Sequence, residues 1–466
     1  MLKTNLSILE EFDSFYFLGI GGIGMSALAR YFLSKKKNVG GYDLTPSTLT
    51  KELEKQGIPI CFEDTLEAIP KWVKKEKTLI IYTPALAKEH KQYAFFKEHL
   101  FSIEKRASII GHITQGKYTI AIAGTHGKTT ISAILSHILY SAGKKITAFI
   151  GGIMQNYQSN FISNGEEIFV IEADEFDRSF LKLSPTIISL SSIDPDHLDI
   201  YENEENFKAA FSTFIEKLPR DKGMLFIQKN IPLTPPPMVS SFSYGLKEDQ
   251  EKIDCYSTLP YSKEGEKGWF FNFYAKKDCY KDLPLPLIGK HNLENITTAI
   301  AIARALDIKP SDIHKALLSF KGIKRRASTY FIKDKIYIDD YAHHPSEINA
   351  IIEGVKSFFP HKKIVGIFQP HLFSRTRDFL EGFAQSLNKL DELILLDIYP
   401  AREKPIQGIN ATLLFDKIKL KDKKKATLSE LPQIIRAPFD ILLTLGAGSI
   451  GELVNPIIEH LKRMHK

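Results

Sequence analysis

The residues best suited to chemistry form a short glycine-rich string, GTHGKTT, at residues 124–130. Glycines let backbone N–H groups approach an anion, and the start of a helix adds partial positive charge. In that setting a lysine contacts the terminal phosphates of a nucleotide, and a threonine hydroxyl binds Mg²⁺. The string therefore predicts an ATP-binding loop, with the candidate residues Gly124, Thr125, His126, Gly127, Lys128, Thr129 and Thr130.

A strand must lead into this loop and a helix must follow it. Residues 119–124 are rich in Ile and Ala, which is typical of a buried strand in a parallel sheet. From Ile131 to Leu139 apolar residues recur at helical spacing, and Gly143 is a natural helix end. The loop is shorter than the common GxxxxGK[ST] pattern, so a plain glycine turn is the alternative interpretation.

Carboxylates and one histidine follow two further apolar runs. The expected strand 168–171 leads into Glu172, and the expected strand 186–193 leads into a DPDHLD string that contains His197. Carboxylates at the C-terminal end of a strand beside a phosphate loop are well placed to bind Mg²⁺, so Glu172 is the predicted ligand. His197 is either a second ligand or a hydrogen-bonding residue of the core, and the pattern alone does not separate these roles.

A second glycine string lies near the start of the chain. Between an expected strand at 15–20 and a helix, Gly19, Gly21 and Gly24 spell G-x-G-x-x-G, and Asp43 lies about twenty residues further on. Backbone amides at a helix start bind a pyrophosphate, so this pattern favours either a dinucleotide such as NAD or a UDP-sugar. A structural glycine turn is the remaining interpretation.

The last part of the chain alternates strands and helices. We expect strands at 336–339, 364–368, 393–396 and 441–445, and helices at 347–358 and 379–390. Such alternation predicts a parallel sheet with helices on both faces. Polar residues gather where these strands end, which is where ligands bind in such sheets, and they include Asp340, Tyr341, His343 and Arg375. The helix expected at 289–306 carries three residues that either cap it or read a base, His291, Asn292 and Asn295.

The 466 residues are too many for one ordinary core, and three domains are expected, at 1–113, 114–322 and 323–466. Each should be α/β and built on an open, mostly parallel sheet. The first and third should be Rossmann-like, and the second should be of the P-loop type.

Composition narrows the function classes. The net charge of +7 suits anionic small substrates, and the lysine runs at 35–37 and 423–425 fit a solvated surface better than a nucleic-acid site. No apolar run approaches the ~20 residues of a membrane helix, and three scattered cysteines fit a reducing compartment. Acidic residues near the start do not resemble a signal peptide. We therefore expect a cytoplasmic monomer or homodimer without membrane insertion or a nucleic-acid partner.

Taken together, the motifs resemble those of the Mur ligase family over nearly the whole chain. GIGGIGMSALA is similar to the family's uridine-nucleotide loop, and GTHGKTT is similar to its ATP loop. EADE and DHLD resemble its metal-binding segments, and GKHNLEN resembles its adenine-contact region. DDYAHHP and FQPH followed by SRTRD resemble its C-terminal cleft segments. Several long motifs in this order are more specific than any one of them.

The resemblance implies an ATP-dependent amide ligase of peptidoglycan precursor synthesis. In the implied reaction, the lactyl carboxylate of UDP-N-acetylmuramate takes the γ-phosphoryl group of ATP, and L-alanine then displaces phosphate from the acyl phosphate. ATP and Mg²⁺ are the implied cofactors. The three domains, in chain order, would bind the UDP-sugar, ATP, and the amino acid together with part of ATP.

The resemblance also implies roles for individual residues. The UDP-sugar would contact Gly19, Gly21, Gly22, Gly24, Met25, Ser26 and Asp43. ATP would contact the phosphate loop together with His291, Asn292, Asn295, Arg326, Asp340 and Tyr341. The metal ligands would be Thr129, Glu172 and His197. Lys128, His343 and Arg375 would be catalytic, and Arg375 with Arg377 would hold the carboxylate of the amino acid.

Three alternatives stay open at this point. A murein tripeptide-recycling ligase of the same family shares the ATP machinery, although its opening glycine loop differs from GIGGIGMS. An NAD(P)-dependent oxidoreductase follows from the first glycine string alone, but it leaves GTHGKTT, EADE and DDYAHHP unexplained. A nucleotide-dependent switch or motor would need a full Walker A loop.

Overall fold

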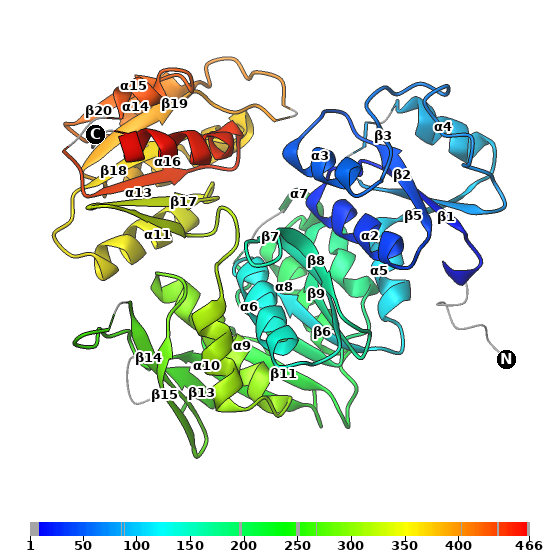
Figure 1. Ribbon diagram of the computed structural model, residues 1–466, viewed down its shortest axis with the longest axis horizontal. Coiled ribbons are helices and arrows are strands. Elements are labelled where there is room, and N and C mark those ends of the chain that lie inside the picture. The colour runs from blue at the N-terminus through cyan, green and yellow to red at the C-terminus, as the bar shows by residue number, and fades with distance from the viewer. Residues whose placement is uncertain are drawn as a thin grey trace. The chain divides into compact units, whose positions relative to one another are not determined.

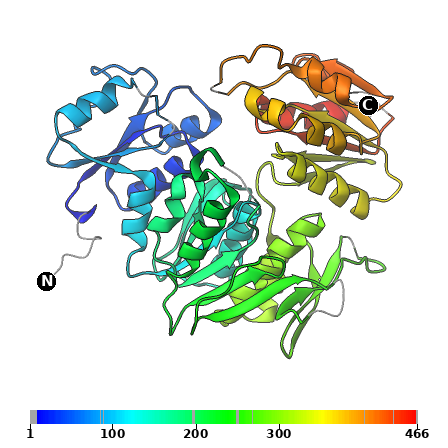
Figure 2. The same cartoon turned by 180° about the vertical axis from the view of Figure 1, so that it is seen from behind.

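The structure is a computed structural model that describes residues 9–84, 86–87, 89–194, 198–247, 252–266, 268–401, 403–435 and 438–463. The described residues form three open sheets flanked by helices (Figures 1 and 2), which confirms the predicted α/β class. They divide into two compact units. One holds the chain up to Pro284 with Glu294–Phe320, and the other holds Leu285–Leu293 with the chain from Lys321 onward. The predicted domain limits at 113 and 322 stay predictions.

The N-terminal sheet has the strand order β3-β2-β1-β4-β5, and every neighbouring pair is parallel. Its strands are β1 (Ser14–Leu18), β2 (Asn38–Tyr42), β3 (Ile60–Cys61), β4 (Thr78–Tyr82) and β5 (Ser102–Lys105). Its helices are α2 (Ile23–Ser34), α3 (Thr48–Lys55), α4 (Lys91–Glu98) and α5 (Arg106–Thr114). The order reverses between β1 and β4, where ligands of open sheets bind. The first glycine string follows β1 and therefore lies at this switch point.

Apolar side chains of β1 point alternately to the two faces of the sheet, which explains why helices cover both faces. The ring of Phe15 stacks on Phe32 of α2, with centroids 3.6 Å apart. Tyr16 and Leu18 belong to the opposite core, with Phe96 of α4. A strand that is apolar on both faces needs cover on both sides, and this burial fixes the strand that leads into the first glycine string.

The central sheet has ten strands in the order β15-β14-β13-β12-β11-β10-β6-β9-β7-β8. Its strands are β6 (Tyr118–Ala123), β7 (Ile146–Met154), β8 (Ser159–Ser163), β9 (Ile168–Ala173), β10 (Ile187–Leu190), β11 (Met224–Gln228), β12 (Ser240–Leu246), β13 (Cys255–Ser257), β14 (Phe270–Ala275) and β15 (Asp278–Pro284). The helices of this region are α6 (Lys128–Ser141), the 3-10 helix η1 (Phe176–Lys182), α7 (Leu198–Tyr201), α8 (Glu204–Ile215), α9 (Lys290–Ala305) and α10 (Pro310–Ser319). Strands β13 to β15 pair in antiparallel fashion, and β12 pairs in parallel with both neighbours.

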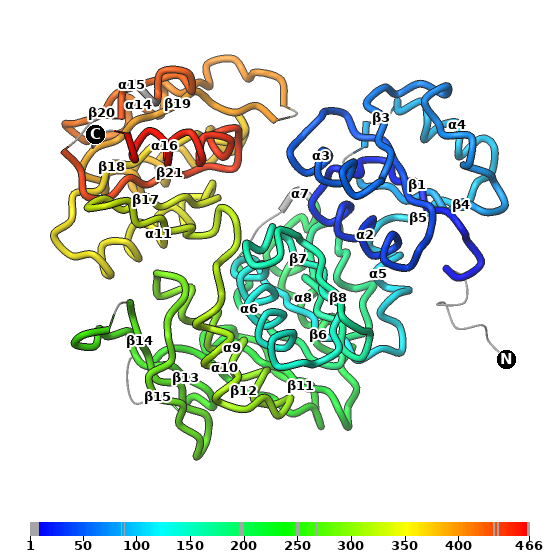
Figure 3. Tube along the Cα trace, in the orientation of Figure 1, coloured from blue at the N-terminus to red at the C-terminus, as the bar shows by residue number. Residues whose placement is uncertain are grey.

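Helix α6 carries the second glycine string into the centre of this sheet. Its residues from Thr129 to Leu139 are all buried, as expected for a helix with packing on every side. The helix ends where the sequence predicts, because Gly143 has φ +81° and its N–H donates to the carbonyl of Tyr140. Helix α10 packs alongside α6, as the chain trace shows (Figure 3).

The C-terminal sheet has the order β16-β17-β21-β18-β19-β20 and is antiparallel only between β16 and β17. Its strands are β16 (Ser328–Ile332), β17 (Lys335–Asp340), β18 (Ile364–Phe368), β19 (Glu392–Leu396), β20 (Lys423–Ala426) and β21 (Ile441–Leu445). The helices are α11 (Pro345–Phe358), α12 (Phe373–Asp378), α13 (Leu380–Leu387), α14 (Ala411–Lys417), α15 (Leu431–Ile434), η2 (Ser449–Leu453) and α16 (Val454–Arg463).

One predicted element of this sheet region is wrong in detail. The helix expected at 379–390 is the shorter α13, and a separate helix, α12, precedes it because Phe379 has φ −115° and ψ 23° and interrupts the helical conformation. The lysine run 423–425 forms part of the edge strand β20, which the sequence did not indicate. Lysines on an edge strand discourage pairing with another chain. No described helix is long and apolar enough to cross a membrane.

Candidate active site

The phosphate loop joins β6 to α6 and needs glycine at two positions. Gly124 has φ +128°, and a Cβ added there would lie 2.8 Å from the backbone nitrogen of Ser192. Gly127 has φ +85° and lies so close to Asn295 of α9 that an added Cβ would overlap the amide. Both positions combine a left-handed backbone with a close approach, so the loop shape depends on these glycines.

Lys128 bends back over its own loop. Its Nζ donates to the carbonyl of Gly124 at 2.6 Å and to Glu175 Oε2 at 2.7 Å. Its side chain is 16% exposed and that of Glu175 is 3% exposed. Burial alone would lower the pKa of the Lys128 ammonium, but the carboxylates of Glu175 and Asp174 outweigh it and raise that pKa above the ordinary lysine value. The loop therefore holds a cation at the position predicted for the terminal phosphates.

Glu175, which the sequence singles out only as part of EADE, is the carboxylate that contacts Lys128. Strand β9 pairs in parallel with β6, and Glu172 lies opposite Ile122 in this register. Continuing that register past the strand ends brings Glu175 beside the phosphate loop. The adjacency of these two strands was the missing signal, because the spacing of residues along the chain does not reveal it.

Glu172 collects donors from three elements. Thr129 Oγ1 donates to Oε2 at 3.1 Å, Ser132 Oγ donates to Oε1 at 2.9 Å, and the N–H of Gly151 donates to Oε1. Burial raises the pKa of the Glu172 carboxyl, a cost that a bound cation would offset. A carboxylate and a threonine hydroxyl are oxygen ligands of the kind that Mg²⁺ shares with phosphate and water, so these residues fit the ion.

The second predicted carboxylate-rich exit lies beside the same loop. Thr125 Oγ1 donates to the carbonyl of Asp194 at 2.7 Å, and His126 Nε2 lies 3.5 Å from Asp194 Oδ2. Thr130 is buried at the start of α6. His197 lies outside the described residues. Within the described part of the chain, no group of three or more His, Cys, Asp or Glu side chains could hold a metal ion.

The residues expected near adenine separate into two groups. Asn295 lies against Gly127 of the phosphate loop and is buried. His291 and Asn292 belong to the second compact unit. There Asn292 Nδ2 donates to the carbonyl of Ile288 at 2.7 Å, as a residue in the first turn of a helix commonly does.

The first glycine string turns tightly at Gly19, where φ is +89°. The N–H of Gly21 donates to Asp43 Oδ2 at 2.7 Å, so the predicted partner residue reaches the loop. Gly22 caps α2. Met25 and Ser26 are buried, and Ser26 uses both its N–H and its hydroxyl inside the protein. The predicted contact of Ser26 with the UDP-sugar stays a prediction.

The exit of β17 assembles four predicted residues. Asp340 accepts from the N–H groups of Ala327 and Ala342, each at 2.7 Å. Burial raises the pKa of its carboxyl to about 6. The guanidinium of Arg326 lies 5.4 Å from the ring centroid of Tyr341. His343 follows at once, with Nδ1 3.0 Å from the carbonyl of Tyr341.

Arg375 joins this cluster from α12. Its Nη1 lies 3.3 Å from His371 Nδ1, and the rings of His371 and His343 are 5.9 Å apart. Burial lowers the pKa of His371 to about 4 and also lowers that of His343, so both rings are neutral at pH 7. Arg377, by contrast, pairs with Asp378 and is 53% exposed. Of these two arginines, Arg375 is therefore the one that lies in this cluster.

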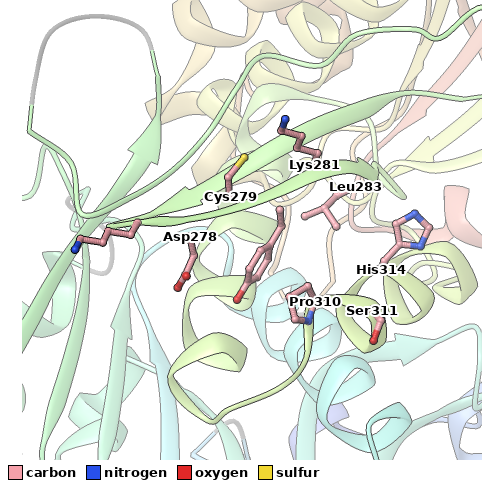
Figure 4. A pocket seen from close by; sticks show the side chains of 9 residues that line it. Asp278, Cys279, Lys281, Leu283, Pro310, Ser311 and His314 are labelled. Carbon is pink, nitrogen blue, oxygen red and sulfur yellow. The ribbon is translucent and has the colours of Figure 1, made fainter.

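A separate cavity of about 470 Å³ lies between β15 and the start of α10 (Figure 4). Cys279, Lys281 and His314 are among its lining residues. β15 is six strands away from β6 in the sheet order, which at ~4.8 Å per strand is roughly 30 Å from the phosphate loop. The cavity is too distant to take part in phosphoryl transfer at that loop.

Family models match the chain in three consecutive stretches. The Mur ligase family catalytic domain matches residues 14–118, and the Mur ligase middle domain matches residues 122–303. The Mur ligase glutamate ligase domain matches residues 325–448. The chain belongs to the Mur ligase family.

Relatives within the Mur ligase family match over the full length. The UDP-N-acetylmuramate--L-alanine ligase of Flavobacterium psychrophilum is 48% identical over 456 residues, which is 97% of this chain and 99% of that protein. The enzyme of the same name from Christiangramia forsetii is 46% identical over 96% of this chain and 98% of its own length. The crystal structure of UDP-N-acetylmuramate-alanine ligase from Thermotoga maritima matches with a TM-score of 0.79 and 28% identity, over 97% of this chain and 98% of that chain.

Proposed function

We propose that this chain is an ATP-dependent ligase that joins L-alanine to the lactyl carboxylate of UDP-N-acetylmuramate. The observation that carries the proposal is the 48% identity to a ligase of that name across 97% of the chain. The geometry agrees with it, because the phosphate loop holds a charged lysine against the buried carboxylate of Glu175 and a threonine hydroxyl against Glu172. An NAD(P)-dependent oxidoreductase reaction would not use this phosphate loop.

The reaction proceeds in two steps. A lactyl carboxylate oxygen attacks the γ-phosphorus of ATP, and ADP leaves, which produces an acyl phosphate. The amine nitrogen of L-alanine then attacks the carbonyl carbon, loses a proton, and expels inorganic phosphate as the amide forms. Lys128 neutralises charge on the transferring phosphoryl oxygens, the main contribution a protein can make to such a transfer.

The site residues take the following proposed roles. Residues Gly124 to Thr130 bind the phosphates of ATP, with Asn295 supporting the loop at Gly127. Thr129, Glu172 and His197 hold Mg²⁺, which when bound neutralises phosphate charge as a Lewis acid. Further contacts to ATP come from His291, Asn292, Arg326, Asp340 and Tyr341. The UDP-sugar is bound by Gly19, Gly21, Gly22, Gly24, Met25, Ser26 and Asp43.

The amino acid is assigned to the C-terminal sheet. Arg375 holds the carboxylate of L-alanine, because an arginine fork can make two parallel hydrogen bonds to a carboxylate. His343 is neutral and lies within the same cluster as Arg375 and His371. We further infer that the chain is cytoplasmic, where ATP and sugar nucleotides are present, and that it is a monomer or homodimer.

Release of ADP by the purified chain tests the proposal. With ATP, Mg²⁺ and UDP-N-acetylmuramate present, we expect release to require an amino acid and to be fastest with L-alanine among L-alanine, L-serine and glycine. Replacing the acceptor with UDP-N-acetylglucosamine, which has no lactyl carboxylate, should abolish it. Faster release with the tripeptide L-alanyl-γ-D-glutamyl-meso-diaminopimelate would support the recycling ligase instead.

A further inference from the structure

Helix α5 begins with Arg106, a residue that no sequence pattern singled out. The helix follows β5, which is parallel to β4, so Arg106 stands at the edge of the N-terminal sheet where ligands bind. The helix also packs closely on η1, since a Cβ added at Gly111 would lie 2.7 Å from the carbonyl oxygen of Lys182. The position of Arg106 is therefore fixed by packing.

The guanidinium of Arg106 lies between the two segments assigned to the substrates. A Cβ added at Gly24 would lie 2.5 Å from its Nη1 and 2.9 Å from its Cζ, so the guanidinium packs directly on the first glycine string. On the other side, Nη2 lies 3.4 Å from Asp174 Oδ2. Asp174 stands directly before Glu175, the partner of Lys128. This places a cation between the UDP-sugar loop and the phosphate loop.

The ion pair between Arg106 and Asp174 is weak enough for Arg106 to leave Asp174 and contact a substrate anion instead. The Arg106 side chain is 27% exposed and that of Asp174 is 42% exposed, and a long, exposed ion pair contributes little to stability. A guanidinium has five N–H donors, and one long contact to Asp174 uses little of that capacity. The neighbouring Lys105 differs, because its Nζ pairs with Asp177 at 2.8 Å.

The negative charge at the first glycine string explains why a cation is needed there. The carboxylate of Asp43 accepts the N–H of Gly21, so the string carries negative charge of its own. A nucleotide sugar brings further negative charge to the same place. Arg106 is the cation that the described contacts place against this string. Without it, an anionic substrate would meet Asp43 uncompensated.

We propose that Arg106 is a substrate-binding residue whose guanidinium leaves Asp174 and donates paired hydrogen bonds to an anionic group of the nucleotide sugar. This inference rests on the proposed function, because it concerns the same UDP-sugar. Two anionic groups of that substrate share the required chemistry, the diphosphate and the lactyl carboxylate. A bidentate contact explains an arginine at this place, because a lysine offers only a point charge.

Calorimetry on the full chain tests the assignment. Arg106→Met keeps the length of the side chain and removes its charge, Arg106→Lys keeps the charge and removes the fork, and Lys105→Met is the matched control. We expect Arg106→Met to raise the Kd for UDP-N-acetylmuramate at least about tenfold and Arg106→Lys to raise it several-fold. Lys105→Met should leave it within about twofold, and the KM for ATP should stay within about twofold in all three.

Binding of UDP-N-acetylglucosamine, which has the diphosphate without the lactyl carboxylate, shows which of the two anionic groups Arg106 contacts. A loss shared by both sugars assigns Arg106 to the diphosphate, and a loss confined to UDP-N-acetylmuramate assigns it to the carboxylate. Wild-type affinity in both Arg106 variants, or an equal loss in Lys105→Met, overturns the inference while the proposed function stands. If Arg106→Met does not fold, Arg106→Lys decides alone. A wild-type chain that binds neither sugar refutes the proposed function and this inference together.

Discussion

The two glycine-rich strings share one backbone plan and differ in charge. Each follows a parallel strand, turns through a glycine with positive φ, and leads into a buried helix. The first string meets the carboxylate of Asp43 and takes its cation from Arg106 on another helix. The second carries Lys128 in the string itself, next to Glu175. Backbone N–H groups indicate only that a glycine string binds an anion. A lysine within the string can in addition stabilise the charge that develops on a phosphoryl group during its transfer.

The helices behind the strings are also held differently. Helix α2 is held through the buried Arg30, which bonds to Asn160 and Gln56. Helix α6 is held through His137, whose Nδ1 lies 2.8 Å from Tyr157 and whose Nε2 lies 3.0 Å from Ser319 Oγ. An arginine keeps its charge over the whole working range of pH, whereas a histidine does not. The two loops should therefore respond differently to acid.

The largest expected effect distinguishes the second glycine string, which contains Lys128, from the first, which only binds substrate. Lys128→Ala should lower kcat about 10²- to 10³-fold, because it removes a preorganised charge at the transferring phosphoryl group. Binding of UDP-N-acetylmuramate should change little. Steady-state kinetics with circular dichroism checks both, and Lys208→Ala serves as control because that lysine pairs with Glu204 on the surface of α8. Near-normal turnover in a folded Lys128→Ala would remove the distinction between the strings.

A glycine in each string provides the next test. Gly127→Ala puts a side chain at φ +85° against Asn295, so kcat/KM for ATP should fall about 30-fold or more, corresponding to roughly 2 kcal/mol. Gly24→Ala meets only the flexible end of Arg106, and its loss should be a few-fold and confined to the UDP-sugar. Equal losses in the two variants would show that the contact at Gly127 constrains its string no more than the contact at Gly24 does.

Acid should weaken the contacts of His137 that hold α6 and should leave the contacts of Arg30 that hold α2 unchanged. Burial lowers the pKa of His137 to about 4, below its unfolded value near 6.5, so its contribution to stability is present above pH 6.5 and is lost as pH falls toward 4. Between pH 7 and pH 5 this loss is about 2 kcal/mol. Urea unfolding should show a smaller pH dependence in His137→Gln than in wild type. The exposed control His99→Gln should keep the wild-type slope, and the same slope in His137→Gln would disprove the assignment.

The smallest expected effect tests whether the amino acid is recognised outside both strings. Arg375→Lys should lower kcat/KM for L-alanine about tenfold, roughly 1.4 kcal/mol, because a lysine loses the bidentate fork. The affinities for ATP and UDP-N-acetylmuramate should stay the same. Arg377→Lys is the matched control, since that side chain pairs with Asp378 at the surface. A normal rate in Arg375→Lys would leave this arginine without a role in amino-acid binding.

Sequence patterns located the strands and the glycine strings because these depend on neighbours along the chain. The strands predicted at 364–368 and 441–445 match the structure residue for residue, since each is an apolar run between polar ones. Helix α12 was not predicted, because its sequence FSRTRD is mostly polar and has no apolar periodicity. Strand β20 was missed because its lysines resemble exposed loop residues.

The site was predictable in its loops and unpredictable in their partners. Glycines, Lys128 and Glu172 belong to short motifs whose chemistry is local. Glu175 and Arg106 act through contacts to residues more than forty positions away in the sequence, and only the folded sheets bring them together. No spacing rule encodes such a contact. Partners of this kind had to come from the structure.

The acyl phosphate is the central chemical claim, and isotope transfer tests it most directly. UDP-N-acetylmuramate with both lactyl carboxylate oxygens replaced by ¹⁸O is incubated with ATP, Mg²⁺, L-alanine and the chain, and the released phosphate is examined by mass spectrometry. Attack of the carboxylate on the γ-phosphorus predicts one ¹⁸O in each inorganic phosphate and one in the new amide. Phosphate released without ¹⁸O during amide formation would show that the carboxylate is activated in another way, and it would contradict the account.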